Sequence, residues 1–243
     1  MKTPINALIA TLGLTMLSPI LLHAGNDNGN PNPGIVSPHA TFKGKTAGEW
    51  TAAWWQWVRG TPGSVQMTDT TGDFAYVNNN GADGVFFLAK SWTEVPEVRT
   101  IEIPAGTPLY VPFMGWGPSA APGEFLAQYG SVESLFEELI SPDILGVHDL
   151  SLEVNGVPAA ALEDGNLHYL NFVEDGDDLI VPIWFEDAQE LREIAGYEFS
   201  AILKPLPPGK HTVRLKGTWS DDSSSFASDV TYHITVLPGK GTE

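Results

Sequence analysis

Apolar residues recur at helical spacing between Thr46 and Arg59, which predicts an amphipathic helix. Thr46 and Glu49 have the spacing of a capping box, and Gly60 follows the helix end. One face would carry Trp50, Ala53, Trp54, Trp57 and Val58. Trp55 lies about 140° around the helix from Trp50. We therefore expect the other helical tryptophans to pack in the core, and Trp55 to contact either a ligand or the N-terminal segment.

After this helix the pattern changes to short extended runs separated by glycine, proline and other turn formers. Apolar and polar residues alternate over 229–236, which is the period of a strand with one buried face. Asn155-Gly156 predicts a type I′ hairpin turn. The predicted strands are 74–77, 85–89, 98–103, 109–113, 150–154, the strand that begins at 157, 168–173, 179–184, 197–203, 211–216 and 229–236.

Two short helices are predicted among these strands, one capped by Ser131 and running to about Ile140, the other covering 187–195. Many strands with few helices predict a mainly β fold. We interpret it as an antiparallel β-sandwich, immunoglobulin-like or jelly-roll-like, with an N-terminal Trp-rich helix and two short helical insertions.

The N-terminus has the layout of a secretory signal peptide, with Lys2, an apolar run over 5–22 and a cleavage site after Ala24. A membrane anchor is the alternative, but polar residues and Pro19 interrupt the run. We expect a secreted or periplasmic protein that is not inserted in a membrane after cleavage. The expected organisation is a signal peptide at 1–24, a flexible linker at 25–41, a single domain at 42–238 and a tail at 239–243.

The charge and the cysteine content exclude several classes of function. The chain has 12 Lys and Arg against 30 Asp and Glu, a net charge of −18. A surface this acidic repels phosphate backbones and anionic lipids, so nucleic acid is not an expected partner. The absence of cysteine rules out disulfides, thiol nucleophiles and zinc-thiolate sites.

Tryptophan and aspartate supply the candidate ligand-binding residues. The chain contains 8 tryptophans, and indole faces that reach solvent stack well on sugar rings. Trp92 and Trp116 fall in segments that resemble loops, and Asp69 and Asp73 flank a short turn. The predicted ligand-binding set is therefore Trp55, Trp92, Trp116, Asp69 and Asp73, with the two aspartates also candidates for catalysis.

Two acidic loops offer the oxygen ligands that calcium prefers. The first contains Asp83, and the second contains Asp175, Asp177 and Asp178. Neither has EF-hand spacing, and turns rich in Asp and Asn also occur without metal. Calcium is thus an open alternative. The sequence has none of the common local signatures of serine hydrolases, zinc proteases or nucleotide-binding enzymes.

Four short motifs lie within residues 46–113. They are the Trp-rich run 49–57, Asp69-Thr-Thr-Gly72, the apolar run 84–89, and Arg99 followed by Pro-Ala-Gly at 104–106. This stretch resembles a group of secreted, tryptophan-rich bacterial proteins for which we know no activity. Members of that group tend to carry two cysteines, at places that here hold Ala75 or Tyr76, and Ile101. The resemblance implies that packing replaces a covalent link.

We favour a ligand-binding protein that recognises an extracellular glycan through a cleft lined by tryptophan and aspartate. One alternative is a glycan hydrolase or lyase that uses a carboxylate as general acid or base. Another is an extracellular matrix or interaction protein. Whether the protein is an enzyme is left open by the sequence, because glycan-active sites are assembled from scattered residues.

Overall fold

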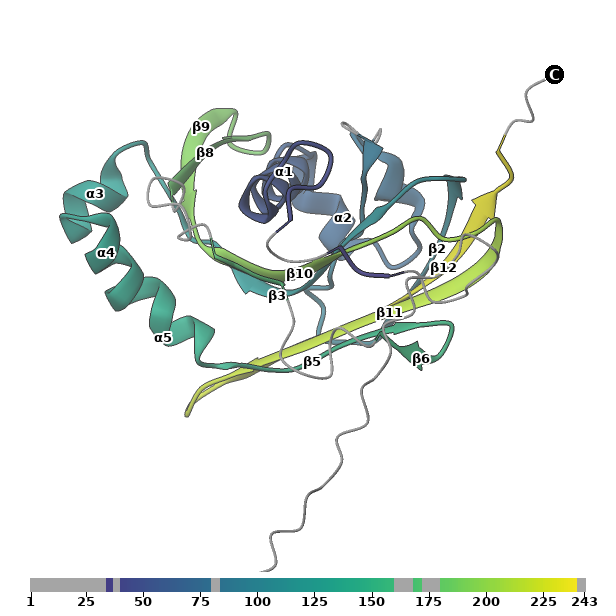
Figure 1. The fold of residues 1–243 in the computed structure, drawn as a ribbon. Coiled ribbons are helices and arrows are strands. Elements are labelled where there is room, and N and C mark those ends of the chain that lie inside the picture. Colours follow the sequence, from purple (N-terminus) through teal and green to yellow (C-terminus); the bar gives the residue numbers. More distant parts are fainter. Residues whose placement is uncertain (1–33, 37–39, 80–83, 160–167, 172–179, 240–243) are drawn as a thin grey trace, which may run out of the picture.

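The computed structural model describes residues 34–36, 40–79, 84–159, 168–171 and 180–239. The protein is mainly β, with its described strands in three sheets (Figure 1). The first sheet has the order β1 (Phe86–Phe87), β3 (Leu109–Trp116), β10 (Tyr197–Leu203), β7 (His168–Asn171). The second has the order β2 (Glu97–Pro104), β12 (Ser225–Leu237), β11 (Gly209–Ser220), β5 (Val147–Val154), β6 (Val157–Pro158). The third has the order β4 (Ser119–Ala120), β9 (Glu190–Ala195), β8 (Ile180–Phe185).

Most strand pairs are antiparallel as predicted, but β1 pairs with β3, and β2 with β12, in parallel. These two parallel pairs depart from the predicted antiparallel arrangement. The chain leaves the first sheet after β1, forms β2 in the second sheet and returns to the first for β3. Turn signals in the sequence do not reveal such a crossing between sheets.

The first and second sheets share one apolar cluster. The strand β12 shows the predicted alternation, with Val230, Tyr232, Ile234 and Val236 buried. Ala75 and Ile101, at the places where the resembling proteins tend to carry cysteine, are both buried in this cluster. Apolar packing is therefore present at both of these places.

The helix α1 (Ala47–Arg59) lies on the other face of the first sheet, and the hairpin of β8 and β9 curves beside it (Figure 1). The predicted capping box is confirmed: Glu49 N donates to Thr46 Oγ1 at 3.2 Å, and Thr46 N donates to Glu49 Oε2 at 2.7 Å. Tryptophans of α1 form an aromatic core with Phe87 and Tyr110. Ile183 and Phe185 of β8, with Ile194 of β9, belong to the same core and cover α1 on the side of the hairpin.

The segment Val85–Ser91 is buried throughout, between α1 and the second sheet. Side chains from several elements bond its backbone: Trp54 Nε1 donates to Leu88 O at 2.8 Å, and Arg99 Nη1 donates to Ala89 O at 2.9 Å. The hydroxyl of Tyr232 contacts both the N and the O of Ala89 at 2.9 Å. Glu97 Oε2 accepts from Arg99 Nη2 at 2.5 Å. Buried backbone groups need such partners, so these bonds fix the segment.

Several other predicted elements are confirmed. The hairpin turn has positive φ at both Asn155 (56°) and Gly156 (75°), as a type I′ turn requires. Ser131 caps the helical segment over 132–144, because its hydroxyl accepts a hydrogen bond from Ser134 N at 3.1 Å. This segment consists of α4 (Val132–Leu135), the π-helical turn η4 (Phe136–Ile140) and α5 (Ser141–Ile144). It runs a few residues beyond the predicted end at Ile140.

Two local predictions are wrong. Residues 187–195 form a turn and the strand β9, because β9 pairs over its whole length with β8. Residues 74–77 are not a strand: the 3-10 helix η2 (Asp73–Tyr76) covers most of them. In the predicted linker, the apolar residues Ile35 and Val36 lie against β10, where Val36 N donates to Ile202 O at 2.9 Å. The remaining helices are η1 (Pro62–Ser64), α2 (Val65–Thr68) and α3 (Glu124–Tyr129).

The two-sided burial of α1 generates a stability prediction. Replacing either Trp54 or Trp55 with alanine should lower the free energy of unfolding by about 3 to 5 kcal/mol, because each substitution leaves a large cavity. Trp116→Ala is the control, since Trp116 is 39% exposed and should cost less than about 1 kcal/mol. Urea unfolding checks this. If Trp55→Ala lowered the free energy of unfolding as little as Trp116→Ala does, the burial of Trp55 beneath the β8–β9 hairpin would be contradicted.

Candidate functional site

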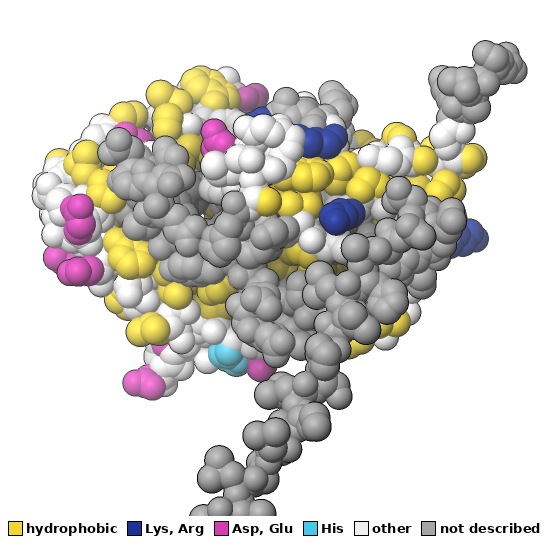
Figure 2. Space-filling model, viewed as in Figure 1, with side chains coloured by type: hydrophobic (Ala, Val, Ile, Leu, Met, Phe, Trp, Pro, Cys, Tyr) yellow, Lys and Arg dark blue, Asp and Glu magenta, His cyan; other side chains and the backbone are white. Residues whose placement is uncertain are grey.

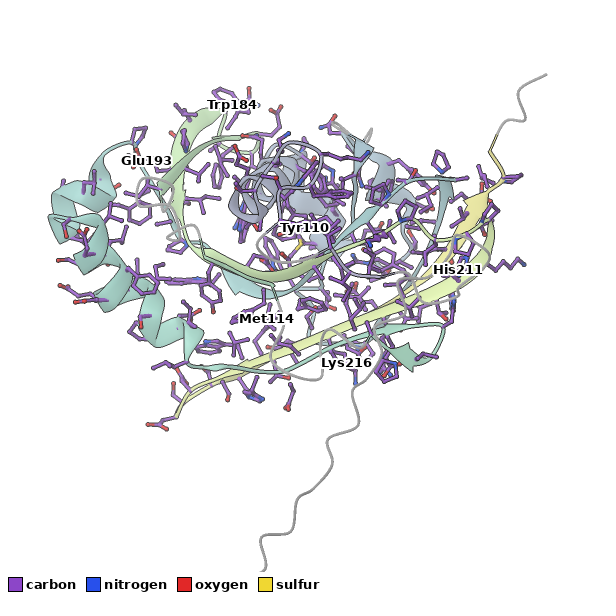
Figure 3. All side chains as sticks on the ribbon, viewed as in Figure 1. Tyr110, Met114, Trp184, Glu193, His211 and Lys216 are labelled. Atoms are coloured by element: carbon purple, nitrogen blue, oxygen red, sulfur yellow. The ribbon has the colours of Figure 1, made fainter. Side chains whose placement is uncertain are left out.

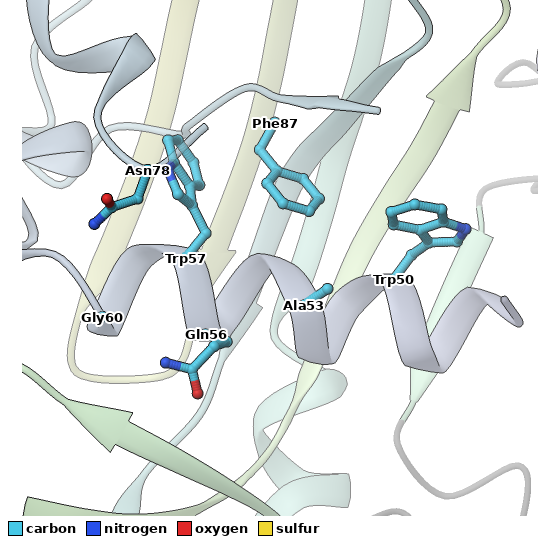
Figure 4. Close-up of a pocket in the computed structure, with 7 residues that line it drawn as sticks. All are labelled: Trp50, Ala53, Gln56, Trp57, Gly60, Asn78 and Phe87. Atoms are coloured by element: carbon cyan, nitrogen blue, oxygen red, sulfur yellow. The ribbon is translucent and has the colours of Figure 1, made fainter. Parts of the chain in front are cut away.

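A groove of about 330 Å³ runs along one side of α1 (Figure 4). Three aromatic residues, two amide residues and two small residues line it: Trp50, Trp57, Phe87, Gln56, Asn78, Ala53 and Gly60. In the view of Figure 4, the rings of Trp57 and Phe87 lie above the helix axis and the Gln56 side chain lies below it, so they form opposite edges of the groove. None of these described lining residues carries a charge. The groove therefore suits a neutral polar ligand.

Neighbouring backbone holds the groove residues in place. Trp57 Nε1 donates to Val77 O at 2.8 Å, which ties α1 to the segment that carries Asn78. The buried Asn79 pairs with Phe87 in both directions, at 3.0 Å and 2.8 Å, and so fixes β1 against the same segment. Asn78 has a φ of 53°, which asparagine tolerates better than most residues. The rings of Trp57 and Phe87 are thus anchored beside the exposed Asn78.

The Gln56 amide is oriented by β8. Trp184 N donates to Gln56 Oε1 at 3.2 Å, and Gln56 Nε2 donates to Trp184 O at 3.3 Å. A primary amide has two donors and two acceptor lone pairs, so each end keeps capacity for a further hydrogen bond. Trp184 itself points outward from β8, where it is 42% exposed (Figure 3). Its Nε1 donates to Glu186 Oε2 at 3.0 Å.

The residues expected to form a common binding cleft are in different environments. Trp55 is 2% exposed, so the expectation of an indole accessible on the helix surface is wrong. The β8–β9 hairpin supplies a second buried face for α1. A Cβ at Gly117 would lie 3.2 Å from Trp55 Cζ2 and 2.8 Å from Ile194 Cγ2, so the glycine makes room for the indole.

Trp92 and Trp116 are 37% and 39% exposed, and neither is among the groove residues. Trp92 lies in a loop as predicted, with its ring centre 5.2 Å from Arg59 Cζ. Trp116 was expected in a loop but is the last residue of β3, paired with Tyr197 of β10. The β3 pairing thus extends further than the apolar run predicts. A part in ligand binding stays a prediction for both residues.

The carboxylate of Asp69 is engaged by its own turn. It accepts hydrogen bonds from Thr71 N (2.8 Å), Thr71 Oγ1 (2.7 Å), Gly72 N (2.9 Å) and Phe74 N (3.0 Å). Burial acts to raise the pKa of Asp69, but these hydrogen bonds outweigh it and hold the pKa below its usual value. Asp69 is therefore suited to shaping the turn and poorly suited to proton donation. Asp73 is exposed at the first position of η2.

The calcium hypothesis is untested by the structure. Its four candidates, Asp83, Asp175, Asp177 and Asp178, lie outside the described residues. Within the described ranges, no group of three or more His, Asp or Glu side chains has the arrangement of a metal site.

Comparisons with protein-family models, curated proteins and solved structures find no match to this chain. In the part that the structure describes, no helix has both the length and the apolar character needed to cross a membrane.

A buried ion pair lies under α1, and the sequence gives no local signal of it. Lys90 Nζ donates to Glu198 Oε2 at 2.5 Å and to Gly115 O at 2.9 Å, with both charged side chains almost fully buried. The ammonium also lies 5.3 Å from the ring centre of Trp54 and 5.5 Å from that of Trp55. Glu198 Oε1 is buried without a partner among the described residues.

Burial acts in opposite directions on the two partners of this pair. It lowers the pKa of Lys90, although the Glu198 charge opposes this effect. It raises the pKa of Glu198 to about 7, against the attraction of Lys90. Each charge therefore depends on the other, because neither has water to stabilise it.

Removing one partner of this pair should be more harmful than removing both. Lys90→Met or Glu198→Leu alone leaves a buried charge without a counter-ion, and we expect a loss of about 3 to 5 kcal/mol in unfolding free energy. The Lys90→Met/Glu198→Leu double variant should lose less than either single variant. Urea unfolding of all four proteins tests this. Strictly additive losses would show that the two charges do not support each other.

The raised pKa of Glu198 predicts a pH dependence of stability. Between its ordinary pKa of 4.5 and about 7, the folded chain binds more protons at this carboxyl than the unfolded chain. This contribution to stability is present in full below 4.5 and is lost as the pH rises through about 7. Relative to the double variant, the native protein should lose roughly 1 to 3 kcal/mol across this window. Parallel pH profiles of the two proteins would contradict the shift.

Proposed function

We propose that this protein binds a neutral glycan unit in the groove along α1. The observation that carries this proposal is the chemistry of the lining, which combines three aromatic rings with two amides and has no charged member among its described residues. The three rings are almost fully buried, with exposures of 1% to 5%, so they supply a continuous apolar wall for the C–H groups of a sugar, while the two amides hydrogen-bond with its hydroxyl groups. In a chain of net charge −18, an uncharged groove favours a neutral ligand over a cation.

Export is part of the same proposal. The signal-peptide layout of residues 1–24 supports a secreted or periplasmic location, where free glycans and cell-envelope glycans occur. The absence of cysteine fits this reading only if packing supplies the stability, and the two large apolar clusters provide such packing. We also propose that the first and second sheets form a sandwich of the immunoglobulin or jelly-roll type, since they share one cluster.

The groove supports binding more than cleavage. A glycan hydrolase needs two carboxyl groups on either side of the bond to be broken, and the described groove lining contains no carboxyl group. Glu198 has the raised pKa of a general acid, but it is completely buried and paired with Lys90. The experiment below distinguishes glycan binding from the two alternatives, a glycan-cleaving enzyme and a matrix protein.

Glycan-array binding, followed by titration of the best ligand, tests the proposal. Gln56→Ala and Asn78→Gly should each weaken binding about tenfold, because each removes an amide that bonds the ligand. Glycine at position 78 retains the positive φ and so avoids added backbone strain. Gln128→Ala is the matched control, since Gln128 is an exposed glutamine on α3.

The outcomes separate the three functions. Binding that both groove variants weaken, without change in the ligand, supports glycan recognition. Cleavage of the ligand on prolonged incubation would favour the enzyme. A folded native protein that binds no glycan, or groove variants that bind as well as Gln128→Ala, would refute the proposal.

A further inference from the structure

Three buried N–H groups near the C-terminal end of α1 have no hydrogen-bond acceptor among the residues that the structure describes. They are Nε1 of Trp55, Nε of Arg59 and Nε of Arg192. A buried donor without an acceptor destabilises the folded state, so three of them at one place require an explanation. An acceptor supplied by a ligand would satisfy them.

The three groups surround the same aromatic rings. Arg59 Cζ lies 5.6 Å from the ring centre of Trp55 and 5.4 Å from that of Phe185. Arg192 Cζ lies 5.7 Å from the ring centre of Phe185. In the hairpin, Arg192 is directly opposite Ile183, which is buried, so both point to the face that covers α1. Both arginines therefore lie against the Phe185 ring, where the β8–β9 hairpin covers α1.

Nearby carboxylates leave these arginines incompletely paired. Glu190 Oε1 is 3.6 Å from Arg192 Nε, too far for a hydrogen bond. The charge of Asp187 stabilises the charged form of Arg59 electrostatically. Asp187 Oδ1 accepts a hydrogen bond from Gly63 N at 2.6 Å. Acidic side chains on the face seen in Figure 2 are at several separate places. Two arginines partly balanced by two carboxylates suit a singly charged anion better than a phosphate dianion.

Trp92 adds an accessible aromatic surface to this position. Its ring centre is 5.2 Å from Arg59 Cζ, and it is 37% exposed. A ligand whose carboxylate reaches the arginines can place a ring against this indole. Guanidinium groups bind carboxylates through two parallel charge-assisted hydrogen bonds, which is the geometry that a two-oxygen anion offers.

We propose that Arg59 and Arg192 bind the carboxylate of a small ring-bearing organic acid between α1 and the β8–β9 hairpin, with Trp92 at the rim. This site goes beyond the proposed glycan groove. It uses different residues, so either site can fail without the other. An aromatic acid and an acidic sugar share the required chemistry, and the experiment distinguishes them.

Calorimetric titration of the whole folded chain with benzoate and with glucuronate tests the proposal, with benzamide and glucose as neutral analogues. We expect one of the acids to bind, and to bind at least about tenfold more weakly to Arg59→Gln and Arg192→Gln. Arg192→Lys should also lose affinity, because it keeps the charge but removes the planar pair of donors. Arg214→Gln is the control, since Arg214 pairs with Asp229 in the second sheet.

Each outcome of this titration either supports or overturns the site. Binding of an acid that falls in the arginine variants, persists in Arg214→Gln and is absent for the neutral analogue supports the site. If Arg59→Gln does not fold, the two Arg192 variants decide, since the Arg192 side chain is 33% exposed and tolerates change. The proposal is overturned if neither acid binds the native protein, if the neutral analogue binds equally, or if the folded arginine variants retain full affinity.

Discussion

The structure depends on how the buried backbone of Val85–Ser91 is hydrogen-bonded. This segment passes between α1 and the second sheet, but only Phe86 and Phe87 belong to a strand. Outside that strand, Leu88 N donates to the backbone at Tyr110 O. Other polar groups take side-chain partners, among them Trp54 from one side and Arg99 with Tyr232 from the other. Because an unpaired buried backbone group is costly, the helix and the second sheet can only pack in the register that supplies these partners.

The same segment places the charged groups of the interior. Ala89 and Ser91 contact the second sheet through Tyr232 and Ser228, while Lys90 between them reaches Glu198 of the first sheet. Alternation along an extended chain thus sends neighbouring residues to opposite layers. The ammonium of Lys90 then lies against the tryptophans of α1, which couples the position of the helix to a buried ion pair.

The helix α1 carries both proposed sites because three structures cover it incompletely. Its Trp50 and Trp57 side is covered by β1 and the segment that carries Asn78, and the groove remains along it. Its Trp55 and Arg59 side is covered by β8 and β9, where buried N–H groups lack an acceptor among the described residues. The proposed neutral and anionic sites therefore lie on different sides of one helix, and each takes its chemistry from the element packed there.

The sequence by itself determined α1 with its capping box, the Asn155-Gly156 hairpin, the alternation of β12 and most strand positions. These features depend on contacts within a few residues, so local spacing predicts them. The groove was not predictable, because Gln56, Asn78 and Phe87 are separated along the chain and meet only when α1 packs on β1. The tertiary structure also decided that 190–195 is a strand, because this segment pairs with β8. It decided that Trp55 is buried, because the β8–β9 hairpin packs over that side of α1. Lys90 and Glu198 lie 108 positions apart, and only the packing of the layers makes them partners.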